Sequence, residues 1–113
     1  MNCLFCKIVA GEIPASKVYE DERLVAFNDI NPQAPLHALV VPKQHVATLN
    51  DLTAADDDLV GAMVRVGATI AKGRGFDGPG FRTVFNCNAQ AGQTVFHIHL
   101  HVLGGRVMTW PPG

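Results

Sequence analysis

Hydrophobic and polar positions along the chain predict five short β-strands. Four segments of strand length are bounded by charged, glycine or proline positions and contain the apolar, β-branched or aromatic residues that strands favour. A fifth segment alternates apolar residues with histidine, which is the period of a strand with two unlike faces. The five predicted strands cover residues 17–20, 24–27, 38–41, 81–85 and 96–103.

Helical periodicity is confined to two segments. Between residues 53 and 73, apolar residues recur every three or four positions after a capping-box-like start with an acidic first turn, which predicts one long helix. Its apolar positions are Leu59, Met63, Val66 and Ile70. The short apolar segment 3–10 is compatible with a brief N-terminal helix. We therefore expect an α+β fold, a single domain over residues 1–113, with a mostly antiparallel five-stranded sheet, one long helix and one short helix.

The composition disfavours several classes of protein. Hydrophobic residues make up 48% of the 113 positions and charged residues 17%, which is typical of a chain that buries a core. The formal net charge is −1 and basic residues form no block, so a nucleic acid is a poor candidate partner. No apolar stretch approaches a membrane span, and the first residues lack the features of a signal peptide. We therefore expect no membrane partner and a cytoplasmic location.

Three of the five histidines stand at alternate positions of the last predicted strand. Because successive strand side chains point to opposite faces, His97, His99 and His101 are expected to share one face, while the apolar residues between them enter the core. Such a row can supply a nucleophile, proton donors or ligands from a stiff backbone. Two other interpretations remain open: the polar face of a half-buried strand, and a metal site of the His-x-His kind.

Small and polar residues before this strand favour an anion as the ligand. Gly92 allows the backbone to approach a ligand closely, and Gln93, Thr94 and Asn86 add neutral donors. These donors could surround a phosphate beside the histidine row. His99, at the centre of the row, is then the candidate nucleophile, because a neutral imidazole near pH 7 can attack phosphorus.

The segment His97–Leu103 matches the His-x-His-x-His-x-x signature of the histidine triad family, in which x is an apolar residue. Flanking segments resemble the histidine triad nucleotide-binding protein branch of that family, which is purine nucleoside phosphoramidase-like. These segments are Ile13-Pro14, Phe27–Pro35, Val41–Lys43, Gly92–Phe96 and the tail Gly104–Gly113 with its Trp-Pro-Pro-Gly end. The resemblance therefore covers essentially the whole chain.

The resemblance implies hydrolysis of purine nucleoside 5′-phosphoramidates or of acyl and aminoacyl adenylates. His99 would attack the α-phosphorus, the amine or acyl group would leave, and water would hydrolyse the nucleotidyl-histidine. His37 would help fix the proton state of the histidine network, and His101 would lie beside the phosphate and leaving group. The alternatives are a dinucleoside polyphosphate hydrolase and a nucleotide-binding regulatory module. A zinc hydrolase with all three histidines on one metal is disfavoured, because His97 and His101 would be about 13 Å apart at Cα in a strand.

By the same resemblance, further residues bind an AMP-like purine nucleotide. The candidate phosphate-binding residues are Asn86, Gly92, Gln93 and Thr94. Asp29 would accept both ribose hydroxyls. The candidate purine slot is lined by Phe5, Ile8, Phe27 and Ile30, for which plain core packing is the competing explanation. The family also implies a homodimer whose two sheets join, and we expect the tail with Trp110 to reach the partner's site.

A Cys-x-x-Cys pair near the N-terminus is a second candidate site. By itself such a pair is ambiguous between metal binding, redox chemistry and chance. Zinc needs about four ligands, and His45 and His97 could complete a set with Cys3 and Cys6. The resemblance supports a structural zinc, because some bacterial-type members carry the metal on such a set, although the better-known animal members lack both cysteines. The third cysteine, Cys87, has no evident partner in the sequence.

Overall fold

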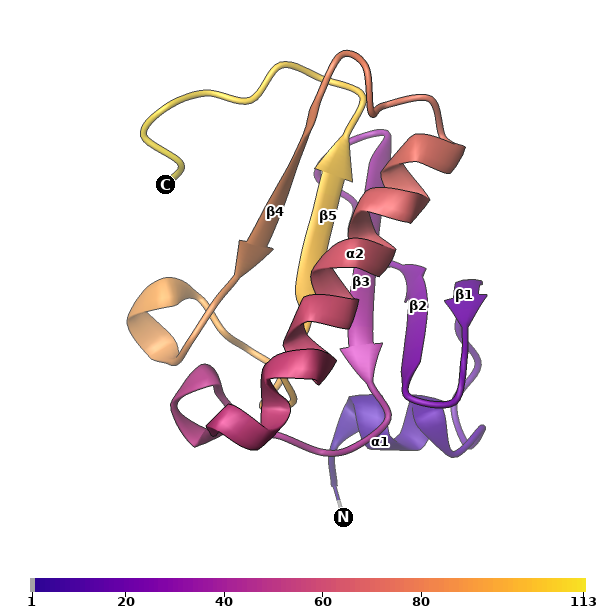
Figure 1. Cartoon of the computed structure of the whole chain (residues 1–113), viewed down its shortest axis with the longest axis vertical. Coiled ribbons are helices and arrows are strands. Elements are labelled where there is room, and N and C mark those ends of the chain that lie inside the picture. The colour runs from indigo at the N-terminus through magenta and orange to yellow at the C-terminus, as the bar shows by residue number, and fades with distance from the viewer. Residues whose placement is uncertain (1) are drawn as a thin grey trace.

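The structure, a computed structural model, describes residues 2–113 and contains one five-stranded sheet (Figure 1). The strands are β1 (Lys17–Glu20), β2 (Leu24–Asn28), β3 (Leu36–Pro42), β4 (Phe81–Phe85) and β5 (Leu100–Gly104). Their order across the sheet is β1-β2-β3-β5-β4, and every neighbouring pair is antiparallel. The predicted fold class is confirmed, and His37 and His101 lie on the two adjacent strands β3 and β5.

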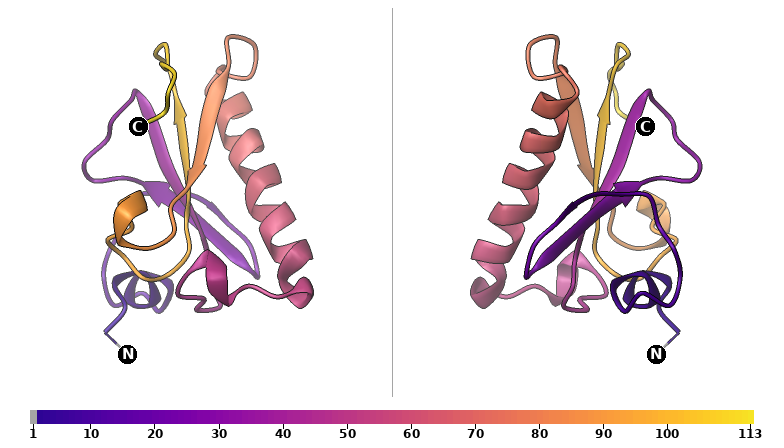
Figure 2. Two further views of the ribbon diagram at one scale, coloured as in Figure 1. Left: turned by 90° about the vertical axis from the view of Figure 1, so that its left-hand side faces the viewer. Right: turned by 90° about the vertical axis from the view of Figure 1, so that its right-hand side faces the viewer.

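Two α-helices pack against opposite faces of the sheet (Figure 2). They are α1, Leu4–Val9, and α2, Asp57–Gly73. The predicted capping box is present: the Thr53 hydroxyl accepts a backbone N–H, and the Asp56 carboxylate accepts the backbone N–H of Thr53. It closes a single 3-10 turn, Ala54–Asp56, that leads directly into α2. Within residues 2–113, no helix combines the length and the apolar character needed to cross a membrane.

The sheet has an apolar layer on each face, because β2 and β3 are apolar at consecutive positions. Leu24 and Ala26 of β2 pack towards α2, whereas Val25 and Phe27 pack towards α1. The side chains that α1 adds to the second layer are Phe5 and Ile8. A helix of six residues is unstable alone, so α1 depends on these contacts for its position.

A glycine on α2 sets how closely this helix approaches β5. A Cβ atom at Gly67 would lie 3.0 Å from Val102 Cγ2 and 3.3 Å from Leu100 Cδ2. Both distances are shorter than ordinary van der Waals contacts, so a larger side chain would push the helix and the strand apart. The absence of a side chain here therefore keeps the layer between α2 and β5 closely packed.

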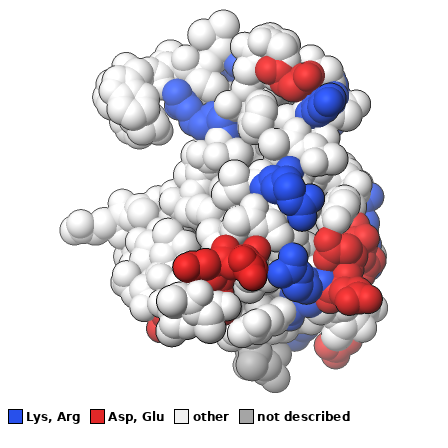
Figure 3. Space-filling model, in the orientation of Figure 1, with Lys and Arg blue, Asp and Glu red and all other residues white. Residues whose placement is uncertain are grey.

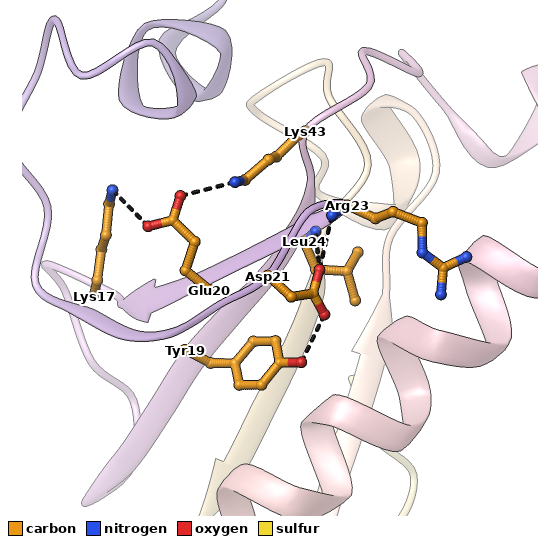
Figure 4. A network of polar contacts seen from close by, with 7 residues as sticks. All are labelled: Lys17, Tyr19, Glu20, Asp21, Arg23, Leu24 and Lys43. Atoms are coloured by element: carbon orange, nitrogen blue, oxygen red, sulfur yellow. Dashed lines mark hydrogen bonds and ion pairs between the residues drawn. The ribbon is translucent and has the colours of Figure 1, made fainter.

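A polar network fixes the turn between β1 and β2 (Figure 4). The Asp21 carboxylate accepts hydrogen bonds from the Tyr19 hydroxyl at 2.6 Å and from the backbone N–H groups of Arg23 and Leu24, both at 2.8 Å. The bond between the two side chains is the main reason that the pKa of Asp21 is lowered and the pKa of Tyr19 is raised. This network is structural and includes no histidine.

The last strand is shorter than the sequence predicts. β5 begins at Leu100 rather than at residue 96, so the prediction that His97 and His99 lie in a strand is wrong. Pairing between β3 and β5 ends at the register Val40↔Leu100, and Pro42 at the end of β3 has no N–H to continue the ladder. The apolar residues between the histidines nevertheless enter the layer under α2 as predicted; they are Ile98, Leu100 and Val102.

Candidate active site

The five histidines of the chain form two groups. In the first, the ring centroid of His101 lies 5.0 Å from that of His99 and 5.2 Å from that of His37. In the second, the rings of His45 and His97 are 4.9 Å apart and contact the N-terminal cysteines. The three alternate histidines therefore do not act as one row, because His97 belongs to a different group from its two neighbours.

Backbone geometry fixes the proton of His99. Its Nδ1 lies 2.8 Å from the carbonyl oxygen of His97, and because a carbonyl only accepts, the proton resides on Nδ1. The Nε2 atom of His99 therefore carries a lone pair. Burial lowers the pKa of His99, which keeps the ring neutral near pH 7. The Phe5 ring packs edge-on against the His99 ring, with centroids 5.0 Å apart, and restrains its orientation.

A second set of hydrogen bonds fixes the protons of His37 and His101. The backbone N–H of Gln33 donates to His37 Nδ1 at 3.0 Å, so neutral His37 carries its proton on Nε2. This Nε2 lies 2.9 Å from His101 Nδ1 and 3.4 Å from Asp29 Oδ2. His101 accepts at Nδ1 and keeps its own proton on Nε2. Burial, and then the neighbouring His99 and His37, lower the pKa of His101 to about 4, so His101 is neutral at pH 7.

Asp29, His37 and His101 bring three possible metal ligand atoms within 4.8 Å of one another, but their protons do not fit a metal. A metal on His37 Nε2 would force the proton to Nδ1, where the N–H of Gln33 already points. The hydrogen on His37 Nδ1 and the amide hydrogen of Gln33 would then face each other. We therefore describe these three residues as a hydrogen-bonded group, called the histidine relay below.

Cys3, Cys6, His45 and His97 form the second group, called the thiol–imidazole cluster below. His97 Nδ1 lies 3.3 Å from Cys3 Sγ, 3.5 Å from Cys6 Sγ and 3.1 Å from His45 Nδ1. Cys6 Sγ lies 3.3 Å from His45 Nδ1. The edges of a tetrahedral zinc site with two sulfur and two nitrogen ligands measure roughly 3.3–3.8 Å, given the usual bond lengths. The spacing of the cluster therefore fits a zinc ion.

The proton of His97 also fits a metal ligand. Its Nε2–H donates to the carbonyl oxygen of Pro42 at 2.7 Å, which leaves the lone pair of Nδ1 directed at the cysteines. Metal-bound histidines commonly donate their second N–H to such an acceptor. The backbone N–H of Cys6 points at Cys3 Sγ, 3.4 Å away, and helps to hold that sulfur in the cluster. His97 therefore meets the proton requirement that His37 fails.

Two hydrogen bonds explain how His45 meets residues distant in the sequence. The backbone N–H of Ile98 donates to the Val46 carbonyl oxygen at 2.8 Å, and Gln93 Nε2 donates to the Ala47 carbonyl oxygen at 2.9 Å. These bonds tie the segment after β3 to the segment before β5. His45 is thereby held beside His97, and the cluster joins three separate parts of the chain.

The candidate phosphate-binding residues lie before β5 and differ in how freely each could contact a phosphate. Gln93 is buried; its Oε1 accepts the N–H of Asn88 at 2.8 Å, and its Nε2 donates to two backbone carbonyls. Its side chain therefore supports the loop, and a phosphate contact would have to replace one of these bonds. Thr94 and Gly92 are exposed and Asn86 is half-buried. Gly92 has φ 89°, a left-handed conformation that glycine adopts without strain.

Of the candidate base-binding residues, three lie together and two lie apart from them. The rings of Phe5 and Phe27 are 5.4 Å apart, and both pack with Ile8 in the apolar layer under α1. Ile30 is fully exposed and Trp110 is 81% exposed. In a single chain, the first three residues serve as core. Roles for Ile30 and Trp110 stay predictions that need a bound nucleotide or a second chain.

Asp29, the candidate ribose ligand, is only partly available. Its Oδ1 accepts the backbone N–H of Asn31 at 2.8 Å, and its Oδ2 faces His37. One fifth of the side chain is exposed, so an incoming hydroxyl can reach the carboxylate. Each carboxylate oxygen can accept more than one hydrogen bond, so the present contacts do not exhaust it.

Sequence reasoning missed the backbone groups that fix the proton positions. They are the carbonyl oxygens of Pro42 and His97 and the N–H group of Gln33. Every residue except proline carries both kinds of group, so no pattern of residue types signals them. The prolines at 32 and 35 restrict the backbone around Gln33, but they do not specify the direction of its N–H.

Known proteins are similar to this chain in both sequence and fold. A family model described as "Scavenger mRNA decapping enzyme C-term binding" matches residues 2–109. Purine nucleoside phosphoramidase of Escherichia coli is 45% identical over 103 residues, which are 91% of this chain and 87% of the relative. A HIT family hydrolase from Legionella pneumophila is 54% identical with a TM-score of 0.98, covering 99% of this chain and 100% of that one. A zinc-bound histidine triad family protein from Mycobacterium smegmatis is 41% identical with a TM-score of 0.82, and the match covers 94% of this chain and 76% of that one. The chain therefore belongs to the histidine triad (HIT) family.

Proposed function

We propose that the chain hydrolyses purine nucleoside 5′-phosphoramidates, or acyl and aminoacyl adenylates, through a nucleotidyl intermediate on His99. Similarity to a purine nucleoside phosphoramidase over most of the chain supports this substrate class. The main observation behind the proposal is the position of the proton on the His99 ring. The His97 carbonyl binds the Nδ1 proton of His99, so the Nε2 lone pair is the nucleophile.

In the first step, Nε2 of His99 attacks the α-phosphorus, and the bond from phosphorus to the leaving group breaks. A leaving nitrogen takes a proton from solvent and departs as the amine, whereas an acyl oxygen departs as the carboxylate. The His99 ring becomes positively charged in the intermediate, and the His97 carbonyl stabilises that charge through Nδ1–H. His101 is neutral and offers its Nε2–H to the phosphoryl oxygens. Because His37 donates to the other nitrogen of His101, the relay orients this donor throughout the reaction.

In the second step, water attacks the phosphorus and releases a proton to solvent, and Nε2 of His99 leaves with the electron pair of the P–N bond. The products are a nucleoside monophosphate and the original neutral imidazole. The proton on Nδ1 stays on the same atom in both steps. The backbone therefore sets the tautomer once, and the ring needs no reorientation between the two displacements.

Nucleotide recognition would use the groups that lie around this nucleophile. The exposed Thr94 and the left-handed backbone at Gly92 would bind phosphate oxygens, with Asn86 beside them. Asp29 would accept the ribose hydroxyls through the exposed part of its carboxylate. The purine would enter between α1 and the sheet edge, next to Phe5, and would cover the exposed side chain of Ile30.

The thiol–imidazole cluster would hold a zinc ion with a structural role. The zinc-bound relative from Mycobacterium smegmatis, the tetrahedral spacing and the proton on His97 Nε2 support this. All four ligands come from the protein, so no coordination position is left for water. Zinc would fasten α1 to the segment that carries the nucleophile, and the chemical steps use only protein side chains.

The active form would be a homodimer in the cytoplasm, without a nucleic acid or membrane partner. In a single chain Val107 is 88% and Trp110 is 81% exposed, and β4 lies at an edge of the sheet. Apolar side chains this exposed, beside an open strand edge, favour contact with a second copy. The two sheets would join, and the tail of one chain would complete the site of the other.

A comparison of substrates tests this function. We expect turnover of an adenosine 5′-phosphoramidate to exceed that of a diadenosine polyphosphate by at least about a hundredfold in kcat/KM. The reverse order would favour the dinucleoside polyphosphate hydrolase. Tight binding of AMP, with neither substrate nor an aminoacyl adenylate hydrolysed, would favour the regulatory module and contradict an enzyme.

A further inference from the structure

We propose that Cys3 and Cys6 form a reversible redox site, in which a hydroperoxide converts the two thiols to a disulfide, expels the metal and loosens α1 from the nucleotide site. The effect on nucleotide binding rests on the function proposed above. The thiol chemistry itself does not, so the two parts can be tested separately.

The two sulfur atoms already lie close together. Both contact Nδ1 of His97, and all the ligand atoms of the cluster lie within 4.8 Å of one another. A disulfide needs sulfur atoms about 2.05 Å apart on Cα atoms separated by about 4.4–6.8 Å. Residues one helical turn apart meet the second condition, so rotation of the side chains can bring Cys3 and Cys6 to bonding distance.

A small oxidant can reach the two cysteines from solvent, because both are half-buried. Cys3 is half-buried and lines a surface hollow of about 420 Å³. The other residues of this hollow are Asn2, Leu4, Thr94, Val95 and Phe96. Cys6 does not line it and lies on the His45 side of the cluster. Both cysteines are half-buried, and of the two only Cys3 lines this hollow, so we assign the attack on the hydroperoxide to Cys3 and the resolving step to Cys6.

The reaction balances with the hydroperoxide as its only oxidant. The Cys3 thiolate attacks the terminal oxygen of ROOH, an S–O bond forms, the O–O bond breaks, and protonation releases ROH and a sulfenic acid. The sulfur of Cys6 then attacks the sulfur of Cys3, and the S–O bond breaks with release of water. Overall, two thiolates, ROOH and two protons give one disulfide, ROH and water. Two thiolate ligands are lost, so a bound metal ion leaves.

The same short helix connects this chemistry to the nucleophile. Phe5 stands between the two cysteines, and its ring packs 5.0 Å from the ring of His99 and 6.0 Å from that of His97. Phe5 and Ile8 of α1 are buried and Val9 is partly buried against the same apolar layer, so three apolar side chains and the cluster hold the helix in place. When two ligands of the cluster are removed, Phe5 is free to move away from His99 and from the purine slot.

The experiment uses the full-length chain, purified under reducing conditions without chelators and loaded with zinc. Hydrogen peroxide is added, and three quantities are followed: the Cys3–Cys6 disulfide by peptide mass, released zinc with a chromogenic chelator, and the Kd for AMP by calorimetry. We expect the disulfide, about one zinc released per chain, and AMP binding weakened about tenfold, the value of one lost aromatic contact. Dithiothreitol with zinc should restore all three values.

Two variants separate this mechanism from general oxidation. Cys87→Ser lacks the cysteine outside the cluster and should respond like the wild type. Cys6→Ser should give no Cys3–Cys6 disulfide, so the only change that dithiothreitol reverses should be the sulfenic acid on Cys3. Peroxide treatment of the wild type that oxidises thiols without a Cys3–Cys6 disulfide would overturn the redox site.

The link to the nucleotide site has its own contrary result. A complete disulfide with zinc released, but with the Kd for AMP unchanged within twofold, would overturn the coupling through α1. If the reduced protein did not bind AMP at all, the proposed function would be contradicted before any peroxide is added. Peptide mass and zinc release would still decide the thiol chemistry in that case.

Discussion

The chemistry available to each histidine depends on the backbone group beside it. The carbonyl oxygen of His97 holds the proton of His99 on Nδ1, whereas Pro42 holds that of His97 on Nε2. Two histidines only two residues apart therefore present different nitrogens with a lone pair, Nε2 in His99 and Nδ1 in His97. The sequence predicts His99 as the nucleophile from its central place. It cannot predict the reacting nitrogen, because the deciding carbonyls are backbone atoms.

At the same scale, we expect the free energy of unfolding to fall as the pH is lowered from about 6.5 towards 4. Burial gives His101 a folded-state pKa of about 4, below its ordinary value of 6.5, and also lowers the pKa values of His37 and His99. In this window the unfolded chain binds protons that the folded chain does not bind. Stability that is fully present above pH 6.5 is therefore lost as the pH falls.

Urea unfolding at a series of pH values measures this effect. His101→Gln removes one of the titrating groups, so its stability should fall less steeply between pH 6.5 and pH 4.5 than that of the wild type. A wild-type stability that stays constant or rises on acidification over this interval would show that the histidines are not buried in their neutral form.

At the scale of the elements, α2 and the strands are predictable, whereas the start of β5 is not. The apolar spacing and the capping residues of α2 are local signals, and the structure confirms them. The alternation over residues 96–103 is also a local signal, but β5 pairs with β3 only as far as Val40. The neighbouring strand therefore decides where β5 begins. No pattern within residues 96–103 contains that information.

For α1, we expect the isolated protein to hold about one zinc ion per chain, and the double variant Cys3→Ser with Cys6→Ser to hold none. Loss of the metal should lower the thermal midpoint by several degrees, because a structural zinc fastens α1 to the segment before β5. Hydrolysis should remain detectable, since no chemical step uses the metal.

Metal analysis must follow purification without chelators, and Cys87→Ser serves as the control with an intact cluster. A metal-free wild type, or a double variant with an unchanged midpoint, would leave the two cysteines without a structural role. Complete loss of activity with the fold intact would instead indicate a catalytic metal.

Two glycines of α2 provide a matched test of its packing on β5. A Cβ atom at Gly61 meets nothing within 4 Å, whereas one at Gly67 meets Val102 at 3.0 Å. Gly61→Ala should stabilise the protein by about 0.5–1 kcal/mol, because alanine favours a helix more than glycine. Gly67→Ala should be less stable than Gly61→Ala, as measured by urea unfolding. Equal stability of the two variants would contradict the close approach of helix and strand.

At the scale of the whole molecule, the exposed apolar side chains are the feature that one chain does not explain. On the face shown in Figure 3, basic and acidic side chains lie among one another, with large uncharged areas between them. Val107 and Trp110, in the tail after β5, are almost fully exposed. Sequence similarity predicts what the tail does in a dimer, whereas in one chain the side chains of Val107 and Trp110 stay exposed.

We expect a homodimer at micromolar concentration, and Trp110 can report on it. Trp110 is the sole tryptophan of the chain, so its fluorescence should be blue-shifted in the dimer and should shift to the red on dilution. Light scattering should give about twice the chain mass of 12.1 kDa. A 12.1 kDa species at micromolar concentration, with fully solvated tryptophan emission, would contradict the predicted homodimer.

The covalent role of His99 is the central claim, and direct capture of the intermediate tests it best. The wild type is mixed with excess adenosine 5′-phosphoramidate, quenched within milliseconds in alkaline denaturant to preserve the P–N bond, digested and analysed by mass spectrometry. We predict an adenylyl group on Nε2 of His99, and in His99→Ala no adduct, a kcat reduced at least about a thousandfold and AMP binding retained. An adduct on another residue, or His99→Ala with more than about a tenth of the wild-type kcat, would contradict the account.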